Sequence, residues 1–360
     1  MFIIISFFTQ FYIFRKLREA RVSNFSKNIF VAWGIFCALI FVASDALKYS
    51  DLISGRFFEI AFALSFTWVI ITILGFFAFL VIDRFTNPKR FNKAKVFAAI
   101  ILTLIGVCWC LSEAYFVQPR HVVIKTSKLP AHLERVRITF LTDLHIGGVS
   151  THWHFDRVMK IVNDSDPDIF ATVGDILDGD MSFRNYELSE LSKTSERARG
   201  KIGAFAVHGN HEYYLFDRKN DKRQDINRII SDDCGLDLLI DERREISDWL
   251  VIIGVDDKPS GWLRGLAHDD DSGKFVLLMK HRPGLLYDQE GKFDLQISGH
   301  THGGQFFPLG YFKNHEYDSV QGLSFEKGSY VYVSNGAGFN AVPMRLFTPP
   351  EVTIIDLIRE

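Results

Sequence analysis

The 360-residue sequence has only four cysteines and almost no net charge, −2 by formal count. Four cysteines cannot cross-link a chain of this length, which excludes a disulfide-stabilised scaffold. An excess of basic residues is also lacking, with 41 Lys and Arg against 43 Asp and Glu, so we expect no nucleic-acid partner. Charged residues make up 23% of the chain and hydrophobic residues 48%, which excludes a disordered protein.

The low net charge is a balance between two unlike parts. Residues 1–117 contain 12 basic and 6 acidic residues, so their net charge is +6. Residues 118–360 contain 29 basic and 37 acidic residues, so their net charge is −8. Twenty of the 34 phenylalanines also lie in the first part. This uneven distribution predicts two domains of different kinds, 1–117 and 118–360.

Residues 1–117 contain four apolar runs, at 2–14, 29–43, 60–82 and 96–111. The third run holds 23 residues without a charge. A helix of that length crosses about 30 Å of hydrocarbon. The first run is short and includes Thr9 and Gln10, so it is either a span or a segment at the membrane surface. We therefore predict an N-terminal α-helical transmembrane bundle with three or four spans.

Basic residues cluster in two of the loops between these runs. The loops at 15–27 and 84–95 contain five Lys or Arg each, whereas the loop at 44–59 contains two. Loops on the cytoplasmic side of a membrane carry such an excess of basic residues. The pattern predicts a multi-pass protein of the cytoplasmic membrane, with residues 118–360 on the extracytoplasmic side.

Residues 118–360 alternate between short β-branched runs and helix-like stretches, after a boundary stretch at 119–130. Strands are expected at 137–142, 169–173, 202–207, 250–255, 275–279, 295–298, 330–334 and 352–357, and helices at 154–163 and 187–199. This alternation is typical of an α/β fold, in which functional sites form at the carboxyl ends of strands.

Five short polar motifs each follow one of these strands. They are Asp143-Leu144-His145, Gly174-Asp175-Ile176-Leu177-Asp178, Gly209-Asn210-His211-Glu212, His281 and Gly299-His300-Thr301-His302. Residues two apart on an extended chain point the same way, so each Asp-x-His or His-x-His pair offers two ligands together. Imidazole and carboxylate together suit Mn, Fe, Zn or Co. Two such metals placed close together clamp a phosphoryl group and activate water.

The five motifs, in this order, resemble the signature of the calcineurin-like metallophosphoesterase superfamily. The stretch Asn335-Gly336-Ala337-Gly338, with Pro343 and Pro349-Pro350 after it, resembles the membrane-associated branch of that superfamily. The resemblance implies a domain of two packed, mixed β-sheets flanked by helices. It also implies a centre of two divalent metal ions, with Mn²⁺, Fe²⁺ or Fe³⁺ and Zn²⁺ as the candidates.

The resemblance assigns a role to each motif residue. One metal ion is held by Asp143, His145, Asp175 and His302. The other is held by Asp175, Asn210, His281 and His300, so Asp175 bridges the two ions. His211 is not a ligand but stabilises or protonates the leaving oxygen. Asp178 is the candidate to orient His211.

The sequence thus predicts a membrane-anchored phosphoesterase that cleaves a phosphate ester or pyrophosphate by attack of a hydroxide bridging the metals. Because the first ligand follows the last span closely, we expect a phosphorylated substrate derived from the membrane or envelope, such as a lipid-linked one. Two alternatives remain: a broad phosphatase or diesterase acting on soluble substrates, and a non-catalytic membrane sensor or scaffold. The sequence leaves the oligomeric state open.

Several other polar residues have less specific interpretations. Arg282, Arg345 and Gln305 are candidates for substrate contact, as is the basic loop at 218–223. His208 is expected to be packed at a strand end. We expect His152 and His154 to be exposed.

Overall fold

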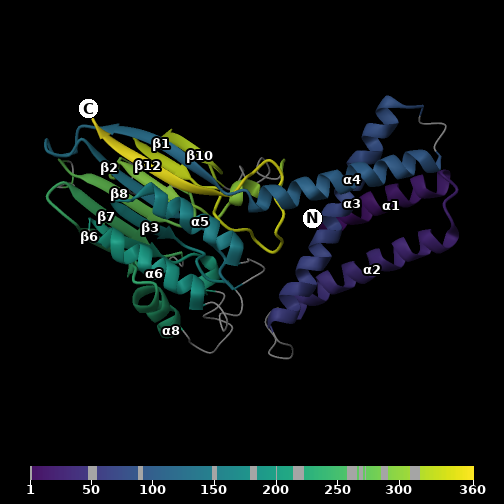
Figure 1. Cartoon of the computed structure of the whole chain (residues 1–360), viewed down its shortest axis with the longest axis horizontal. Helices are drawn as coiled ribbons and strands as arrows, with labels where there is room; N and C mark the ends of the chain where they lie inside the picture. The colour runs from purple at the N-terminus through teal and green to yellow at the C-terminus, as the bar shows by residue number, and fades with distance from the viewer. Residues whose placement is uncertain are drawn as a thin grey trace. The chain divides into compact units, whose positions relative to one another are not determined.

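The computed structural model describes residues 2–47, 55–87, 92–147, 152–178, 185–199, 201–213, 223–257, 266, 271, 273–284, 291–308 and 317–360. The chain divides into two compact units, Met1–Ser112 and Glu113–Glu360 (Figure 1). We call them the helical unit and the catalytic unit.

The helical unit contains four long helices. They are α1 (Phe2–Glu19), α2 (Asn24–Leu47), α3 (Gly55–Phe85) and α4 (Lys93–Tyr115), the last of which ends inside the catalytic unit. Among the described residues, Ala61–Phe85 and Lys93–Tyr115 are long and apolar enough to cross a membrane, which is evidence from length and composition alone. The described part of α2 includes a further apolar stretch, Asn24–Ile40.

Polar contacts connect α1 to α3. The Lys16 Nζ atom lies 2.6 Å from Asp83 Oδ2, and the Tyr12 hydroxyl donates to the same oxygen at 3.0 Å. These contacts bring the carboxyl ends of α1 and α3 to the same end of the unit.

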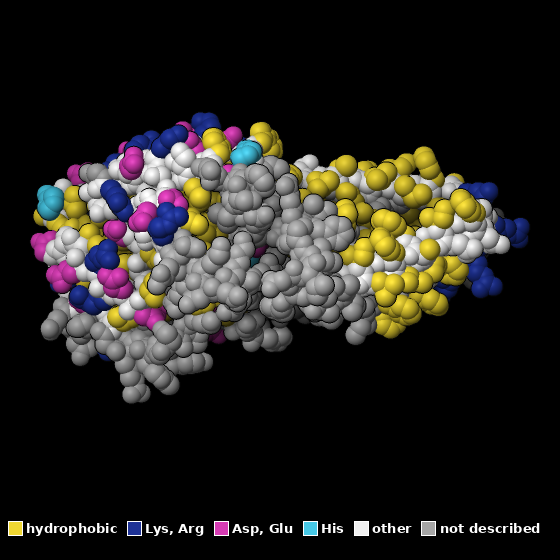
Figure 2. Space-filling view, turned by 90° about the horizontal axis from the view of Figure 1, so that it is seen from below, with side chains coloured by type: hydrophobic (Ala, Val, Ile, Leu, Met, Phe, Trp, Pro, Cys, Tyr) yellow, Lys and Arg dark blue, Asp and Glu magenta, His cyan; other side chains and the backbone are white. Residues whose placement is uncertain are grey.

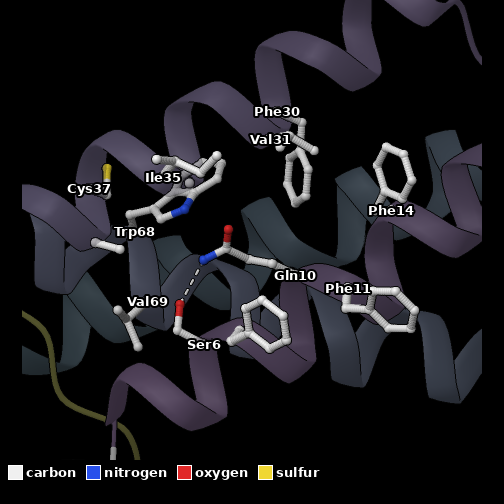
Figure 3. Close-up of a pocket in the computed structure, with 13 residues that line it drawn as sticks. Ser6, Gln10, Phe11, Phe14, Phe30, Val31, Ile35, Cys37, Trp68 and Val69 are labelled. Atoms are coloured by element: carbon white, nitrogen blue, oxygen red, sulfur yellow. Dashed lines mark hydrogen bonds between the residues drawn. The ribbon is translucent and has the colours of Figure 1, made fainter.

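A cavity of about 290 Å³ lies among α1, α2 and α3, and Figure 3 shows its lining. The lining is mostly aromatic and aliphatic, with Gln10 donating to Ser6 Oγ at 2.7 Å.

The catalytic unit is built on two six-stranded sheets. The first has the order β1-β12-β2-β3-β4-β5. Its strands are β1 (Gln118–Thr126), β12 (Glu351–Arg359), β2 (Arg135–Leu141), β3 (Ile169–Val173), β4 (Gly203–Val207) and β5 (Asp237–Leu238). The second has the order β10-β11-β9-β8-β7-β6. Its strands are β10 (Gly322–Glu326), β11 (Ser329–Val333), β9 (Leu295–Ser298), β8 (Phe275–Lys280), β7 (Leu250–Val255) and β6 (Glu242–Glu245).

Both sheets are mixed, and they pack face to face. Only the β12–β2, β10–β11 and β6–β7 pairs are antiparallel among the described pairs. Side chains such as Ile138 and Phe140 of the first sheet share one buried core with Ile252 and Leu277 of the second. Helices α5 (His152–Ser165) and α6 (Asn185–Arg199) cover the outer face of the first sheet, through a core that includes Phe155. The expectation of two packed, mixed sheets flanked by helices is confirmed.

Strands β2, β3 and β4 are mutually parallel, as are β7, β8, β9 and β11. Parallel strands direct their carboxyl ends to one edge of a sheet. Four of the motif residues, Asp143, Asp175, His281 and His300, follow β2, β3, β8 and β9 directly. The fold therefore brings the polar motifs of both sheets to one edge of the packed pair.

One expectation about the catalytic unit was wrong. The stretch after Pro119 was expected to be a boundary segment, but residues 118–126 form β1, which pairs with β12 in parallel. Among the described strands, β1 pairs with β12 alone, and most of its side chains are exposed. An edge strand of this kind lacks the continuous apolar run that marks a buried strand.

Candidate metal centre

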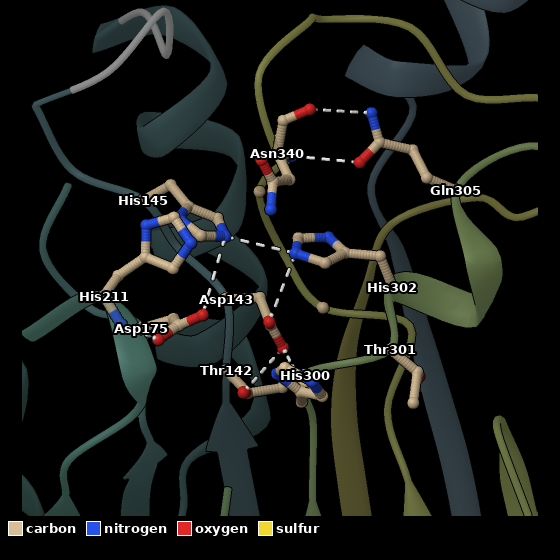
Figure 4. Close-up of polar contacts among 12 residues, drawn as sticks. Thr142, Asp143, His145, Asp175, His211, His300, Thr301, His302, Gln305 and Asn340 are labelled. Carbon is tan, nitrogen blue, oxygen red and sulfur yellow. Dashed lines mark hydrogen bonds and ion pairs between the residues drawn. The ribbon is translucent and has the colours of Figure 1, made fainter. Parts of the chain in front are cut away.

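Two buried carboxylates lie at the centre of the strand-end motifs. Asp143 follows β2 and Asp175 follows β3, with φ angles of 54° and 52°. Residues other than glycine rarely adopt this left-handed backbone conformation. Where they do, the residues are concentrated at functional sites. The Asp143 Oδ2 atom accepts from Thr142 Oγ1 at 2.7 Å and from the His300 backbone N–H at 3.0 Å (Figure 4). The Asp175 Oδ1 atom accepts from the His211 backbone N–H at 2.8 Å.

Imidazole nitrogens converge on these carboxylates. His302 Nε2 lies 3.2 Å from Asp143 Oδ1 and 3.1 Å from His145 Nε2 (Figure 4). His281 Nδ1 donates to the Val173 carbonyl oxygen at 2.8 Å, which leaves Nε2 facing Asp175 Oδ2 at 3.2 Å. An imidazole held by its other nitrogen in this way has a fixed direction, so Nε2 points to the place where a metal ion would bind.

Three overlapping groups of these side chains each place their ligand atoms within 4.8 Å of one another. They are Asp143 with His145 and His302, Asp175 with His145 and His211, and Asp175 with His281 and His300. The carboxylate of Asp175 thus belongs to more than one group. Asn210 adds a further oxygen, because its buried Oδ1 has no hydrogen-bond partner among the described residues. Nitrogen and oxygen donors gathered at this density, with an unsatisfied buried amide oxygen, fit two divalent metal ions.

Electrostatics at the site favour carboxylates over carboxylic acids. Burial alone would raise the pKa of Asp143, but the neighbouring imidazoles of His302, His281 and His145 together outweigh it and hold the pKa well below the ordinary value. Burial lowers the pKa of His302 to about 4. Burial and the charge of His281 together lower the pKa of His300 to about 3. These two imidazoles are therefore neutral at pH 7, the state in which a histidine binds a metal.

His211 has the opposite electrostatic character. Its Nδ1 lies 3.1 Å from Asp178 Oδ1, and Asp178 Oδ2 lies 3.4 Å from His145 Nδ1. Burial would lower the pKa of His211, but the charges of Asp175 and Asp178 raise it to about 9. His211 is therefore an imidazolium at neutral pH and can donate a proton. The contact between His211 and Asp178 has the geometry that their predicted roles require.

Glu212 was given no role by the sequence, although it belongs to the third motif. Its carboxylate is buried and accepts from the backbone N–H groups of Asp175 at 3.0 Å, Leu177 at 2.9 Å and Gly209 at 2.7 Å. Glu212 thereby ties the loop after β3 to the loop after β4. Its position beside His211 in the motif was the available signal.

Two expected substrate contacts are buried instead. The Arg345 guanidinium is fully buried and donates to the backbone oxygens of Asn335, Gly338 and Thr348 at 2.6–2.8 Å. It also lies 3.2 Å from His302 Nδ1, so it positions that imidazole. Gln305 is buried as well and exchanges hydrogen bonds with the backbone of Asn340 (Figure 4).

Arg282 lies closer to the metal-binding side chains. It forms a two-pronged ion pair with Asp257 at 2.7 and 3.2 Å and places Nη1 at 3.3 Å from His300 Nε2. Its side chain is 36% exposed, so it is the member of these three candidates that a substrate can reach. Apart from Arg223, the basic loop at 218–223 lies outside the described residues.

The remaining histidines differ in how well the sequence predicted them. His208 is buried between Asp256 at 3.2 Å and Asn227 at 2.9 Å, as expected for a packed histidine. His154, expected to be exposed, is 2% exposed and donates from Nε2 to the Ala337 carbonyl oxygen at 2.7 Å. His152 is exposed and lies 3.0 Å from Glu187.

Comparison with known proteins agrees with this geometry. Residues 136–304, which include every motif residue discussed above, match the family model of the calcineurin-like phosphoesterases. An uncharacterized metallophosphoesterase of Aquifex aeolicus is 33% identical over 255 residues, which cover 68% of this chain and 93% of the relative. The chain belongs to the calcineurin-like phosphoesterases. It therefore carries a metal-dependent phosphoric ester hydrolase domain.

Other proteins match this chain with lower identity. A transmembrane protein with metallophosphoesterase domain from Danio rerio is 27% identical over 286 residues, covering 74% of this chain and 63% of that protein. A nuclease from Pseudomonas putida matches in structure with a TM-score of 0.29 and 12% identity, over 60% of this chain and 78% of the other. That likeness is too weak to bear on the expected absence of a nucleic-acid partner.

Proposed function

We propose that this protein is a membrane-anchored phosphoesterase with two divalent metal ions, and that its substrate is a phosphate ester or pyrophosphate at the membrane. The observation that carries the proposal is the carboxylate of Asp175, which belongs both to the group with His145 and His211 and to the group with His281 and His300. We propose that one ion is held by Asp143, His145, Asp175 and His302. The other is held by Asp175, Asn210, His281 and His300.

Each remaining polar residue of the site has a task in this proposal. Two divalent ions, when bound, neutralise the charge of a phosphoryl group and lower the pKa of water between them. The imidazolium of His211, 15% exposed, donates its proton to the leaving oxygen. Asp178 keeps that imidazolium charged and fixes its direction. Glu212 holds the loops that carry Asp175 and His211.

The choice of metals follows from the donor atoms. Imidazole nitrogens, carboxylate oxygens and an amide oxygen are all intermediate or hard ligands, and the site contains no thiolate among its described residues. Mn²⁺, Fe²⁺ or Fe³⁺ and Zn²⁺ bind to such sets. We propose these as the candidate pairs.

Membrane anchoring through residues 1–117 is supported by the surface of the helical unit. Among its described residues, 23 large apolar side chains are exposed, far more than a water-facing protein tolerates. Figure 2 shows this hydrophobic surface, with Lys and Arg gathered at one end of the helical unit. The contacts of Lys16 and Tyr12 with Asp83 bring the carboxyl ends of α1 and α3, which the basic segments follow in the sequence, to the same end of the unit. The proposal includes three or four spans, with the basic loops in the cytoplasm and residues 118–360 on the extracytoplasmic side.

Replacing the shared carboxylate tests the metal centre. The purified Asp175→Asn protein should lose at least about 100-fold in phosphoesterase turnover, because even residues that only support metal ligands contribute about 10–100-fold. Its metal content, measured by elemental analysis, should fall below two ions per chain. Asp164→Asn, a change at an exposed surface carboxylate, serves as the matched control. Near-normal activity of Asp175→Asn would exclude this two-metal mechanism.

A further inference from the structure

Exposed aromatic side chains gather around the end of α4 in the catalytic unit. Four of them, Phe116, Trp153, Phe307 and Phe347, are 49–62% exposed. They are half of the eight large apolar side chains exposed among the described residues of this unit. We call these four residues the aromatic patch.

Contacts within the catalytic unit fix the patch to α4. The Thr348 backbone N–H donates to Glu113 Oε1 at 2.6 Å, which holds Phe347 beside the last turn of the helix. The Tyr115 ring lies 5.7 Å from the ring of Trp153. The rings of Phe307 and Phe347 contact each other edge to face at 6.1 Å. All four aromatic residues therefore surround the point where α4 ends.

The basic side chain of Arg157 lies beside the aromatic patch. The Arg157 guanidinium lies 5.2 Å from the ring centre of Trp153 and 5.8 Å from that of Phe116. A tryptophan ring next to a basic side chain is typical of protein surfaces at the level of lipid headgroups, and phenylalanine rings beside it add apolar surface for the bilayer. An arginine there also attracts lipid phosphate.

We propose that the aromatic patch rests in the headgroup region of the bilayer that α4 crosses, and so holds the catalytic unit against the membrane. The proposal rests on the proposed membrane anchoring. If α4 spans the bilayer, its end at Tyr115 lies at the membrane surface, and side chains packed around that end lie there too.

The patch is joined directly to the metal centre. The backbone at 305–307 runs beside that at 345–347, through hydrogen bonds from Leu346 N to Gln305 O at 3.0 Å and from Phe307 N to Leu346 O at 2.9 Å. Arg345, which positions the ring of His302, lies two residues before Phe347. A bilayer contact at the patch therefore places the site within reach of phosphates carried by lipids.

A lipid-quenching experiment on the full-length chain tests the proposal. The background carries Cys108→Ser, because Cys108 is exposed whereas Cys37, Cys110 and Cys234 are buried. Phe347→Cys is labelled with a fluorescent probe and placed in phosphatidylglycerol–phosphatidylcholine nanodiscs containing nitroxide-labelled lipid. Phe325→Cys is the matched control, since Phe325 is equally exposed, at 65%, but lies on β10. Phe307→Cys replaces the first variant if that protein does not fold.

We expect nitroxide lipid to quench the probe at 347 several-fold more strongly than the probe at 325, and aqueous iodide to show the reverse order. Equal quenching at both positions would overturn the proposal. Protection of position 347 from both quenchers would also overturn it and would indicate that another protein surface covers the patch. Extraction of the unlabelled protein from membranes by alkaline carbonate would contradict the anchoring itself, which separates the two failures.

Discussion

Asp178 contacts both the proposed proton donor His211 and the proposed metal ligand His145, so its replacement is measured on proton donation and on metal binding together. Its carboxylate contacts His211 and raises the pKa of that imidazole, which burial would otherwise lower. Asp178→Asn should therefore reduce kcat by about 10–100-fold, as for other residues that orient a functional imidazole. The folded pKa of His211 should fall, so the loss of activity at alkaline pH should begin at a lower pH.

The pH profile of kcat, measured beside metal content, checks this expectation. Asp164→Asn again provides the control, since that carboxylate only pairs with Lys160 on the surface. An unchanged alkaline limb in Asp178→Asn would show that Asp178 has no influence on the proton donor.

The clustering of the motif residues was predictable because each of them belongs to a short motif at a strand end. Each of the five motifs lies directly after or within a few residues of a buried strand, and the fold brings those strand ends together. Glu212 and Arg345 were not predictable in the same way. Their partners are backbone N–H and carbonyl groups of distant segments, which carry no signature in the sequence.

At the scale of elements, the loops after β3 and β4 approach each other at a glycine. A Cβ atom at Gly209 would lie 2.2 Å from Asp175 Oδ1 and 2.4 Å from Asp175 N. Gly209→Ala should therefore displace the proposed bridging ligand and lower the free energy of unfolding by about 1–3 kcal/mol.

Denaturant unfolding and metal content measure both effects. Gly273→Ala is the matched control, because no atom lies within 4 Å of a Cβ at that position. Equal stability of the two variants would mean that the loops can separate without cost.

Helix α5 makes the stability of the catalytic unit depend on pH. Burial lowers the pKa of His154 to about 4, whereas an unfolded histidine titrates near 6.5. The unfolded chain takes up this proton first as the pH falls. The stabilisation is therefore complete above about pH 6.5 and is lost progressively down to about pH 4, by roughly 3 kcal/mol in total.

His154→Gln keeps a hydrogen-bond donor for Ala337 but does not titrate. Its free energy of unfolding should decline less between pH 6.5 and pH 4 than that of the parent, as followed by urea denaturation at several pH values. Parallel curves for the two proteins would show that His154 does not contribute to the acid sensitivity.

The elements were predictable where burial was continuous. Strands β3, β7 and β9 are buried at every position, and their apolar runs reveal them. Strands β1, β6 and β10 lie at sheet edges or carry exposed polar residues, so their sequences resemble loops. These segments are strands because they form hydrogen bonds to a neighbouring strand. For β1 that neighbour is β12, which is far away in the sequence.

At the scale of the whole molecule, the proposed topology predicts which surfaces a reagent can reach. In intact cells expressing the chain with Cys108→Ser, Lys160→Cys on α5 should react with a membrane-impermeant maleimide. Arg18→Cys at the basic end of α1 should react only after the membrane is permeabilised. Gel-shift labelling measures both, and the opposite order would invert the proposed orientation.

The left-handed backbone at the metal centre has a consequence for protein engineering. Asp143, His145, Asp175, His300 and His302 all have φ between 50° and 70°, a conformation that costs a residue with a side chain about 1 kcal/mol or more. Glycine relieves that cost at each of these positions. Directed evolution for heat resistance alone would therefore enrich glycine there and deliver robust proteins that no longer hydrolyse anything. Such an experiment therefore needs a selection for phosphoesterase activity at every round.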